Sequence, residues 1–185
     1  MLKNKILDYE QVLNVLDKIT KKGVIKKTND IGKSEYKLPI EQYIVGSGKN
    51  HIVITGATHG CEIITTDFIL NLMNNISDKY CEWSEVLKEF TIHFIPMLNP
   101  EGYLISTSAI RAIIPRDMPE DVAERICKEY YEYYRNDDIV DSKIKHHQKM
   151  FADIDYTCIP EKYAKIRSAI KEIFELYPDL PNGCL

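Results

Sequence analysis

The sequence lacks three features that would place the protein in a special class. It contains no uninterrupted run of about 18 apolar residues, so no membrane-spanning helix is predicted. Basic residues are not in excess, because 24 Lys and Arg stand against 28 Asp and Glu, which argues against nucleic acid as the main partner. None of the five cysteines forms a Cys-x-x-Cys pair, which argues against a disulfide framework and a structural zinc knuckle.

The first ten residues also lack the apolar core of a secretory signal, because Lys3, Lys5, Asp8 and Glu10 interrupt them. With the unpaired cysteines, this absence predicts a cytoplasmic protein. The chain has 185 residues, of which 44% are hydrophobic and 28% are charged. This length and composition predict a globular domain with a core of its own.

The pattern of apolar residues predicts strands that alternate with helices. Asp8 and Gln11 form a capping pair ahead of an amphipathic helix that ends at residues 21–23. A second helix is predicted after Glu62, and further helices at 119–135 and from Pro160 onward. Strands are predicted at residues 24–27, 38–45, 51–55 and 90–97. This order is typical of an α/β domain.

His59 and Glu62 are the first candidate functional residues. They follow the apolar strand at 51–55, and a histidine and a carboxylate three residues apart can reach one ion when a strand ends and a helix begins between them. Gly60 lets the backbone bend close to that ion. Taken alone, His-x-x-Glu is a weak signal, because the same spacing also arises by chance on surface helices.

Two further motifs make the prediction of a metal site at His59 and Glu62 more specific. Upstream lies Ile31-Gly32-Lys33-Ser34 followed by Leu38-Pro39-Ile40, and Asn99-Pro100-Glu101-Gly102-Tyr103 forms a predicted turn that ends the next strand. In this order and spacing the three motifs resemble the M14 zinc carboxypeptidases, over roughly residues 5 to 116. The resemblance implies an α/β fold with a mixed central sheet flanked by helices. It also implies that residues 1–185 form a single, incomplete carboxypeptidase-like domain with a helical insertion at 117–180.

The resemblance also implies roles for particular residues. His59 and Glu62 match two of the three ligands of a catalytic Zn²⁺ ion, and Arg111 and Arg116 lie where the family places basic residues that bind the substrate. In Asn99–Tyr103, Glu101 replaces the usual aspartate, and the turn is expected to shape the site. The family's Asn-Arg motif, third ligand, tyrosine and general-base glutamate have no match in this chain. We therefore expect a zinc-dependent hydrolase of C-terminal peptide bonds, acting on peptides, of which this chain is an incomplete or inactive form.

Alternatives remain open at this stage. An aspartoacylase-like zinc deacylase also carries His-Gly-x-Glu after a strand, and a degenerate zinc- or peptide-binding domain would need no general base. Nothing in their spacing favours His146 or His147 as a third ligand, and His93 is expected to be a packed or edge residue of its strand. Cys61 is expected to be a small buried thiol. Self-association through an exposed sheet edge is a further expectation for an incomplete domain.

Overall fold

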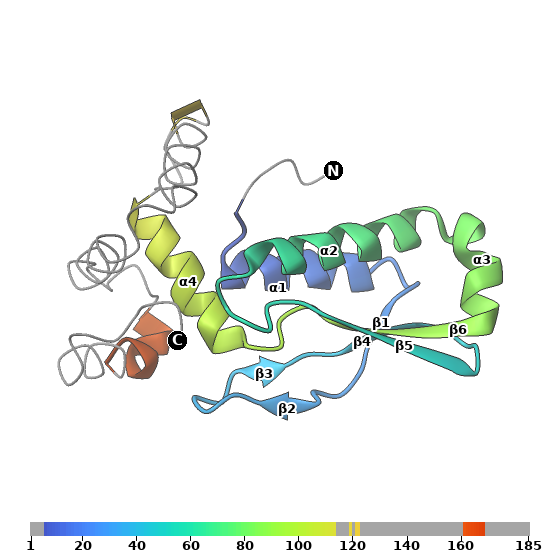
Figure 1. The fold of residues 1–185 in the computed structure, drawn as a ribbon, viewed down its shortest axis with the longest axis horizontal. Coiled ribbons are helices and arrows are strands. Elements are labelled where there is room, and N and C mark those ends of the chain that lie inside the picture. The colour runs from blue at the N-terminus through green and yellow to red at the C-terminus, as the bar shows by residue number, and fades with distance from the viewer. Residues whose placement is uncertain (1–5, 114–118, 120, 123–160, 169–185) are drawn as a thin grey trace, which may run out of the picture. The chain divides into compact units, whose positions relative to one another are not determined.

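A computed structural model describes residues 6–113, 119, 121–122 and 161–168 of the chain. The chain divides into two units, Met1–Thr107 and Ser108–Leu185. The first unit contains a four-stranded mixed sheet in the order β1-β4-β6-β5 (Figure 1). Its strands are β1 (Lys26–Lys27), β4 (Tyr43–Gly46), β5 (Asn50–Thr55) and β6 (Phe90–Ile95). β4 is antiparallel to both β1 and β6, whereas β5 is parallel to β6.

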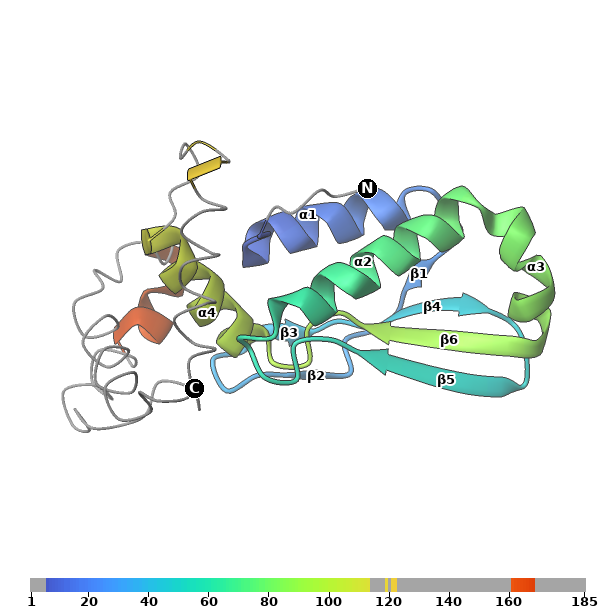
Figure 2. The same cartoon turned by 45° about the horizontal axis from the view of Figure 1, so that its top comes forward.

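Two helices, α1 (Tyr9–Thr20) and α2 (Ile63–Asp78), lie side by side on one face of this sheet (Figures 1 and 2). The predicted capping box begins α1: Gln11 donates its backbone N–H to Asp8 Oδ1, and Asp8 donates its own to Gln11 Oε1, both at 3.0 Å. These bonds satisfy two amide donors that a helix start leaves free. A shorter helix, α3 (Tyr80–Glu89), follows α2 and leads into β6.

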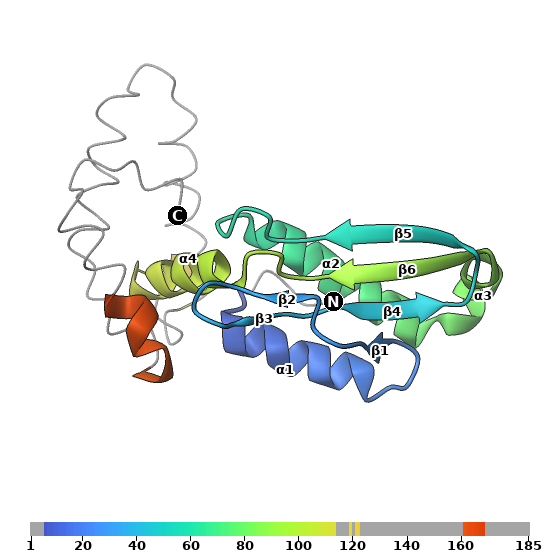
Figure 3. The ribbon, with the colours of Figure 1, turned by 90° about the horizontal axis from the view of Figure 1, so that it is seen from below.

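The core of this unit lies between the helix pair and the sheet. α1 and α2 contribute apolar side chains every three or four residues, the spacing that keeps them on one helical face. Alternate residues of β4 and β6 point toward these helices, which is why Tyr43, Val45, Ile92 and Phe94 are buried. The sheet face opposite α1 and α2 is turned toward the viewer in Figure 3, and none of the described helices covers it.

A small hairpin, β2 (Gly32–Lys33) with β3 (Pro39–Ile40), carries the Gly-Lys-Ser motif. Its turn is closed by Ser34, whose backbone N–H donates to Leu38 O and whose Oγ accepts from the Leu38 N–H, each at 2.9 Å. The strand predicted at 38–45 is therefore two strands, since Glu41 and Gln42 separate β3 from β4. This interruption lets β3 and β4 belong to different sheets.

The fold class is confirmed: a mixed sheet with helices packed on it. Two helices differ from the prediction. α3 was not predicted, and Asn99–Tyr103 is not a free-standing turn, because helix α4 (Pro100–Ile113) begins within it. In the second unit, Glu161–Tyr163 forms a turn of 3-10 helix directly after Pro160. The helix predicted at 119–135 and most of the predicted insertion at 117–180 lie outside the described residues and stay predictions.

Candidate metal centre

Two loops form the candidate site, one after β5 and one after β6. Because these strands are parallel, their carboxyl ends meet at the same edge of the sheet, which is where ligand sites gather in α/β proteins. Backbone hydrogen bonds join the loops: Leu98 donates to Gly56 O at 2.8 Å and Asn99 donates to Ala57 O at 3.0 Å. The loop that carries His59 is thus held against the loop that carries the Asn-Pro-Glu-Gly-Tyr motif.

Gly60 is the point of closest approach between the loops. A Cβ atom built on Gly60 would lie 2.0 Å from Gly102 C and 2.3 Å from Gly102 Cα. No side chain fits at such distances, and the obstacle is backbone, which cannot rotate away. The His59–Glu62 motif and the Asn99–Tyr103 motif are therefore in contact through Gly60 and Gly102. This contact explains why residue 60, beside His59, is a glycine.

Ala57 adopts a left-handed backbone conformation, with φ of 45°, and its side chain is fully buried. That conformation is unfavourable for residues other than glycine, so the surrounding bonds must hold it. The Ala57 N–H donates to Thr65 Oγ1 at 2.7 Å, and the Thr65 hydroxyl donates to Glu62 O, also at 2.7 Å. The first turn of α2 thereby fixes the bend that turns the chain from β5 toward His59.

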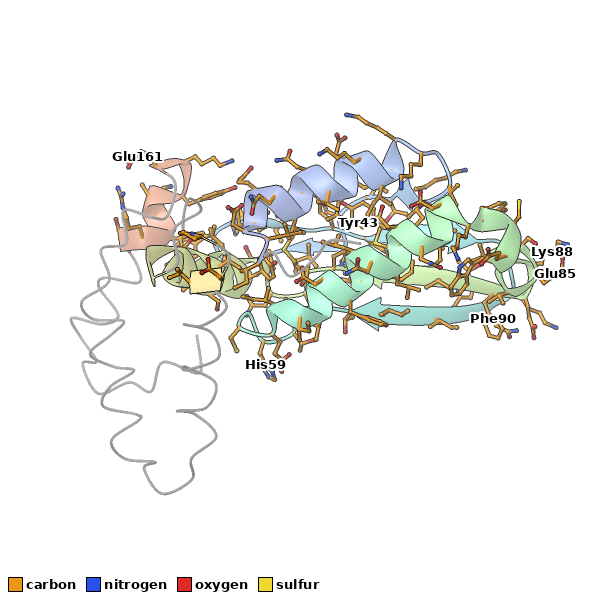
Figure 4. All side chains as sticks on the ribbon, turned by 90° about the horizontal axis from the view of Figure 1, so that it is seen from above. Tyr43, His59, Glu85, Lys88, Phe90 and Glu161 are labelled. Carbon is orange, nitrogen blue, oxygen red and sulfur yellow. The ribbon has the colours of Figure 1, made fainter. Side chains whose placement is uncertain are left out.

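His59 and Glu62 come together at the amino-terminal end of α2. His59 Nδ1 lies 3.0 Å from Glu62 Oε1, and the two side chains are 74% and 45% exposed. His59 projects outward from the loop that precedes α2 (Figure 4). The hydrogen bond from the His59 side chain, and after it the one from the His59 backbone N–H, hold the pKa of Glu62 below its ordinary value. Glu62 is thus an ionised carboxylate beside an imidazole nitrogen, both open to solvent.

This donor pair fits a zinc ion in part. Imidazole nitrogen and carboxylate oxygen are ligands that zinc prefers in catalytic sites, and their 3.0 Å separation is compatible with bonds of about 2.0–2.2 Å to a shared ion. A catalytic zinc site needs a third protein ligand. Within the described ranges, no group of three or more His, Cys, Asp or Glu side chains is arranged to hold a metal ion.

The third motif reaches the same region through Glu101. The Tyr36 N–H, in the turn of the β2–β3 hairpin, donates to Glu101 Oε1 at 2.5 Å. Asn99 precedes Pro100 and accepts the Gly102 N–H at Oδ1 over 2.8 Å, which caps the start of α4. Glu101, which replaces the aspartate expected from the resemblance, therefore joins the hairpin motif to helix α4.

The other candidate residues have different outcomes. The backbone of Arg111 lies in α4, whereas Arg116 lies outside the described residues, so substrate binding by either stays a prediction. The expectation that Cys61 is buried is wrong: its thiol is exposed, because the residue lies in the outward-facing loop between His59 and Glu62. His146 and His147 lie outside the described residues.

Sequence reasoning missed the two threonines that brace this site. Thr65 links Ala57 to Glu62, and the buried Thr66 hydroxyl donates to Pro96 O at 2.7 Å, which ties α2 to the chain beyond β6. Two consecutive threonines near a helix start could have indicated these bonds, because threonine hydroxyl groups there commonly form hydrogen bonds with backbone groups.

Asp67, one turn into α2, is an acid without a local hydrogen-bond partner. Its Oδ1 atom is buried and finds no partner among the described residues. Burial raises its pKa from 3.8 to about 6. A raised pKa means that the folded protein holds this proton more tightly than the unfolded chain. The associated stability is therefore complete below about pH 4 and is lost as the pH rises through about 6.

We expect Asp67→Asn to stabilise the protein at pH 7.5 and to have little effect at pH 4. A shift of this size would correspond to about 3 kcal/mol for a fully buried group. Because the residue is partly exposed, solvent screening reduces the expected gain to about 1 kcal/mol. Urea denaturation at both pH values measures it. Asp17→Asn, at an exposed ion pair with Lys21, is the matched control. An equal gain at pH 4 and pH 7.5 would contradict the argument.

Known proteins resemble this chain in both sequence and fold. The sequence model described as zinc carboxypeptidase matches residues 12–141. The γ-D-glutamyl-L-diamino acid endopeptidase 1 of Lysinibacillus sphaericus is 26% identical over 103 residues, which cover 51% of this chain and 26% of that protein. The bovine thrombin-activatable fibrinolysis inhibitor, in complex with a tick carboxypeptidase inhibitor, superposes with a TM-score of 0.50 and 22% identity over 55% of this chain and 34% of that one. A second structure of thrombin-activatable fibrinolysis inhibitor gives a TM-score of 0.51 at 20% identity, over 56% of this chain and 28% of that one. The chain thus spans about a quarter to a third of the length of these relatives.

Proposed function

Because this chain belongs to the M14 zinc carboxypeptidase family, we propose that it carries the amino-terminal part of a zinc-dependent hydrolase of C-terminal peptide bonds. The observation that carries the proposal is the approach of His59 Nδ1 to Glu62 Oε1, 3.0 Å apart at the carboxyl edge of the sheet. In this proposal both residues hold Zn²⁺. When bound, the ion supplies the Lewis acidity that polarises a carbonyl and activates water.

The described residues supply positioning for this chemistry. Thr65 fixes the bend before His59, and the contact between Gly60 and Gly102 sets the distance between the two loops. The chain spans 26% of the curated relative that it matches. We therefore propose that a third ligand and a general base would come from sequence outside these 185 residues. For these reasons we propose that the 185 residues alone are an incomplete or inactive form.

The substrate is a peptide in this proposal, with Arg111 or Arg116 binding the substrate or stabilising the developing oxyanion. The name of the Lysinibacillus relative favours a second candidate, a peptide with a bond between a γ-linked glutamate and a diamino acid. No helix in the described parts of the chain is both long and apolar enough to cross a membrane. A cytoplasmic location is also part of this proposal, and the free thiols of Cys61 and Cys81 support it.

We expect the chain to bind zinc weakly at His59 and Glu62 and to hydrolyse no peptide at a measurable rate. Two protein ligands leave at least two positions to water, so affinity falls far below that of a three-ligand site. Zinc should shift the ring ¹⁵N signals of His59. Glu62→Ala should lower the zinc affinity measured from these shifts by at least about tenfold, or about 1.4 kcal/mol. Glu85→Ala, an exposed glutamate on α3, is the control.

Two results would count against the proposal. A zinc response of His59 that survives Glu62→Ala unchanged would separate the two residues chemically. Chelator-sensitive turnover by the isolated chain would show that it is complete. Assays with a C-terminal peptide, a γ-glutamyl diamino-acid peptide and an N-acyl amino acid distinguish the peptidase from a deacylase of the aspartoacylase type. Zinc binding without turnover of any substrate, even after the full-length protein is assayed, would favour the non-catalytic alternative.

Self-association through the outer edge of β5 is part of the same proposal. Within the described residues β5 pairs only with β6, and its sequence contains neither lysine nor proline, the residues that commonly protect a sheet edge. Val53 on β5 is 60% exposed, and Ile64 and Phe68 on the neighbouring α2 are 75% and 61% exposed. An unpaired strand beside exposed apolar side chains favours pairing with a second chain.

We expect light scattering to give a mass that rises with protein concentration. Val53→Lys should raise the dissociation constant by about tenfold or more, because pairing would bury the added charge. Val86→Lys, at a valine on α3 that is 42% exposed, adds the same charge away from β5 and should leave association unchanged. An equal mass for all three proteins at every concentration would exclude association through β5.

A further inference from the structure

A second pair of histidines lies within hydrogen-bond distance on the sheet, away from His59. His51 is the second residue of β5 and His93 is the fourth residue of β6. In the parallel register His51 lies opposite Thr91 and Val53 lies opposite His93, so the two histidines are diagonal neighbours on one face of the sheet. That face is opposite the helices, because Ile92 and Phe94, which alternate with His93, are buried in the core.

The imidazole rings face each other through nitrogen atoms. His51 Nδ1 and His93 Nε2 are 2.8 Å apart, and the ring centroids are 5.1 Å apart with a tilt of 34°. Such a contact requires one nitrogen to donate and the other to accept, so at least one of the two rings is neutral. Neutral imidazole is also the form that binds metal ions. His51 is exposed and His93 half-buried, so the pair is open to ions in solution.

Gln42 determines which ring donates. Its Nε2 lies 3.4 Å from His93 Nδ1, and its Oε1 lies 3.1 Å from the Thr28 hydroxyl, which also has Gln42 O and Asn29 O as acceptors at 3.2 Å. The backbone N–H of Thr28 also donates to Gln42 O, at 2.9 Å. With the Gln42 amide in this orientation, His93 Nδ1 accepts from Gln42, and His93 Nε2 carries the proton and donates to His51 Nδ1. A metal-bound histidine commonly donates its second ring N–H to a neighbouring acceptor, and Gln42 could accept such a bond through Oε1 once its amide turns.

We propose that His51 and His93 form a second site for a divalent cation of the zinc and copper class, separate from the site at His59 and Glu62. Two imidazole nitrogens bound to one zinc ion at about 2.0–2.1 Å lie about 3.3 Å apart in tetrahedral geometry, so the present 2.8 Å must open by about 0.5 Å. Small rotations of two surface rings provide this. Imidazole suits zinc and copper, and copper(II) binds more tightly to nitrogen sites than zinc does.

Ion binding also moves one proton. The proton on His93 Nε2 transfers through water to Nδ1, which leaves both facing nitrogens free to bind and releases no net proton. Gln42 must then turn its Oε1 atom toward Nδ1 and give up the bond from Thr28. The ion would join the amino-terminal end of β5 to the middle of β6, while the strand β5 continues into the loop that carries His59. A glutamate at residue 42 would accept a hydrogen bond from the protonated His93 Nδ1 through either of its carboxylate oxygens.

The test uses the full chain with His59→Ala and Glu62→Ala, which removes the other candidate site. Zinc chloride is added while the ring ¹⁵N signals of all histidines are followed. We expect the signals of His51 and His93 to shift together and saturate at one ion per chain. His51→Gln and His93→Gln should each weaken binding by at least about tenfold, and Gln42→Glu should strengthen it by about tenfold. Copper(II) should bind more tightly than zinc.

Controls make the outcome decisive. Unfolding midpoints without metal should be equal for the His51→Gln variant and its parent, which shows that the ring nitrogen and not the fold was lost. Zinc shifts confined to His146 and His147, or binding unchanged by both His51→Gln and His93→Gln, would overturn the proposal. Because the background lacks His59 and Glu62, failure here leaves the proposed catalytic site untouched.

Discussion

Replacing Gly60 with alanine is expected to lower the free energy of unfolding by about 3 kcal/mol. The added methyl group would lie 2.0–2.4 Å from the backbone of Gly102, so the two loops must separate. Separation would strain the hydrogen bonds from Leu98 and Asn99 to the Gly56–Ala57 backbone. Urea denaturation measures the loss, and the ring signals of His59 report whether its environment changes as well.

Gly32→Ala is the matched control for this substitution. A Cβ atom on Gly32 would meet only Ile40 Cδ1, at 3.7 Å, which is ordinary van der Waals contact. The backbone there does not need a positive φ, so we expect a change within about 0.5 kcal/mol. If Gly60→Ala proved as mild as Gly32→Ala, the close contact between the two motif loops would be wrong.

Removal of the Tyr103 side chain is expected to have the other large effect. Tyr103 is fully buried, and its hydroxyl donates to Leu7 O at 2.7 Å, which ties the segment before α1 to α4. Tyr103→Ala should cost about 4 kcal/mol, since it removes a large core side chain and leaves a cavity. Tyr103→Phe keeps the ring and removes only the hydrogen bond, so about 1 kcal/mol is expected. Denaturation of both variants separates packing from hydrogen bonding.

The two variants also test the role of the motif. If Tyr103→Phe lowered the free energy of unfolding as much as Tyr103→Ala, the hydroxyl and not the ring would supply most of the stabilisation. The bond with Leu7 would then be the main role of the motif tyrosine. If neither variant changed stability, Tyr103 could not be the residue that holds the amino-terminal segment. The expected large difference between them identifies this tyrosine as a packing residue of the family motif.

The local features of this fold were predictable because their causes lie close together in the sequence. The capping box of α1 needs only Asp8 and Gln11, three residues apart. The buried strand β6 and the helix α2 follow from runs of apolar residues with the period of each element. The approach of His59 to Glu62 was likewise predictable, because a strand end followed by a helix start brings residues three apart onto the same side.

The parts that sequence reasoning missed depend on contacts between distant residues or on competing local signals. Asn99-Pro100 begins either a turn or a helix, and the start of α4 gains a bond from the hairpin, Tyr36 N–H to Glu101. Nothing near Gly60 in the sequence indicates that Gly102 lies against it. The exposure of Cys61 follows from the outward path of a loop whose bend at Ala57 is fixed by Thr65.

The bond between Tyr103 and Leu7 also bears on the order of events during synthesis. The two residues are 96 positions apart, and α1 follows Leu7 directly. A ribosome releases the chain from its amino terminus, so α1 is free long before its anchor on α4 emerges. Contacts of such long range close late and slow folding, because a large loop must be ordered first. The segment before α1 therefore lacks this anchor until residue 103 has been made, after the residues of α2 and β6 that cover the apolar face of α1.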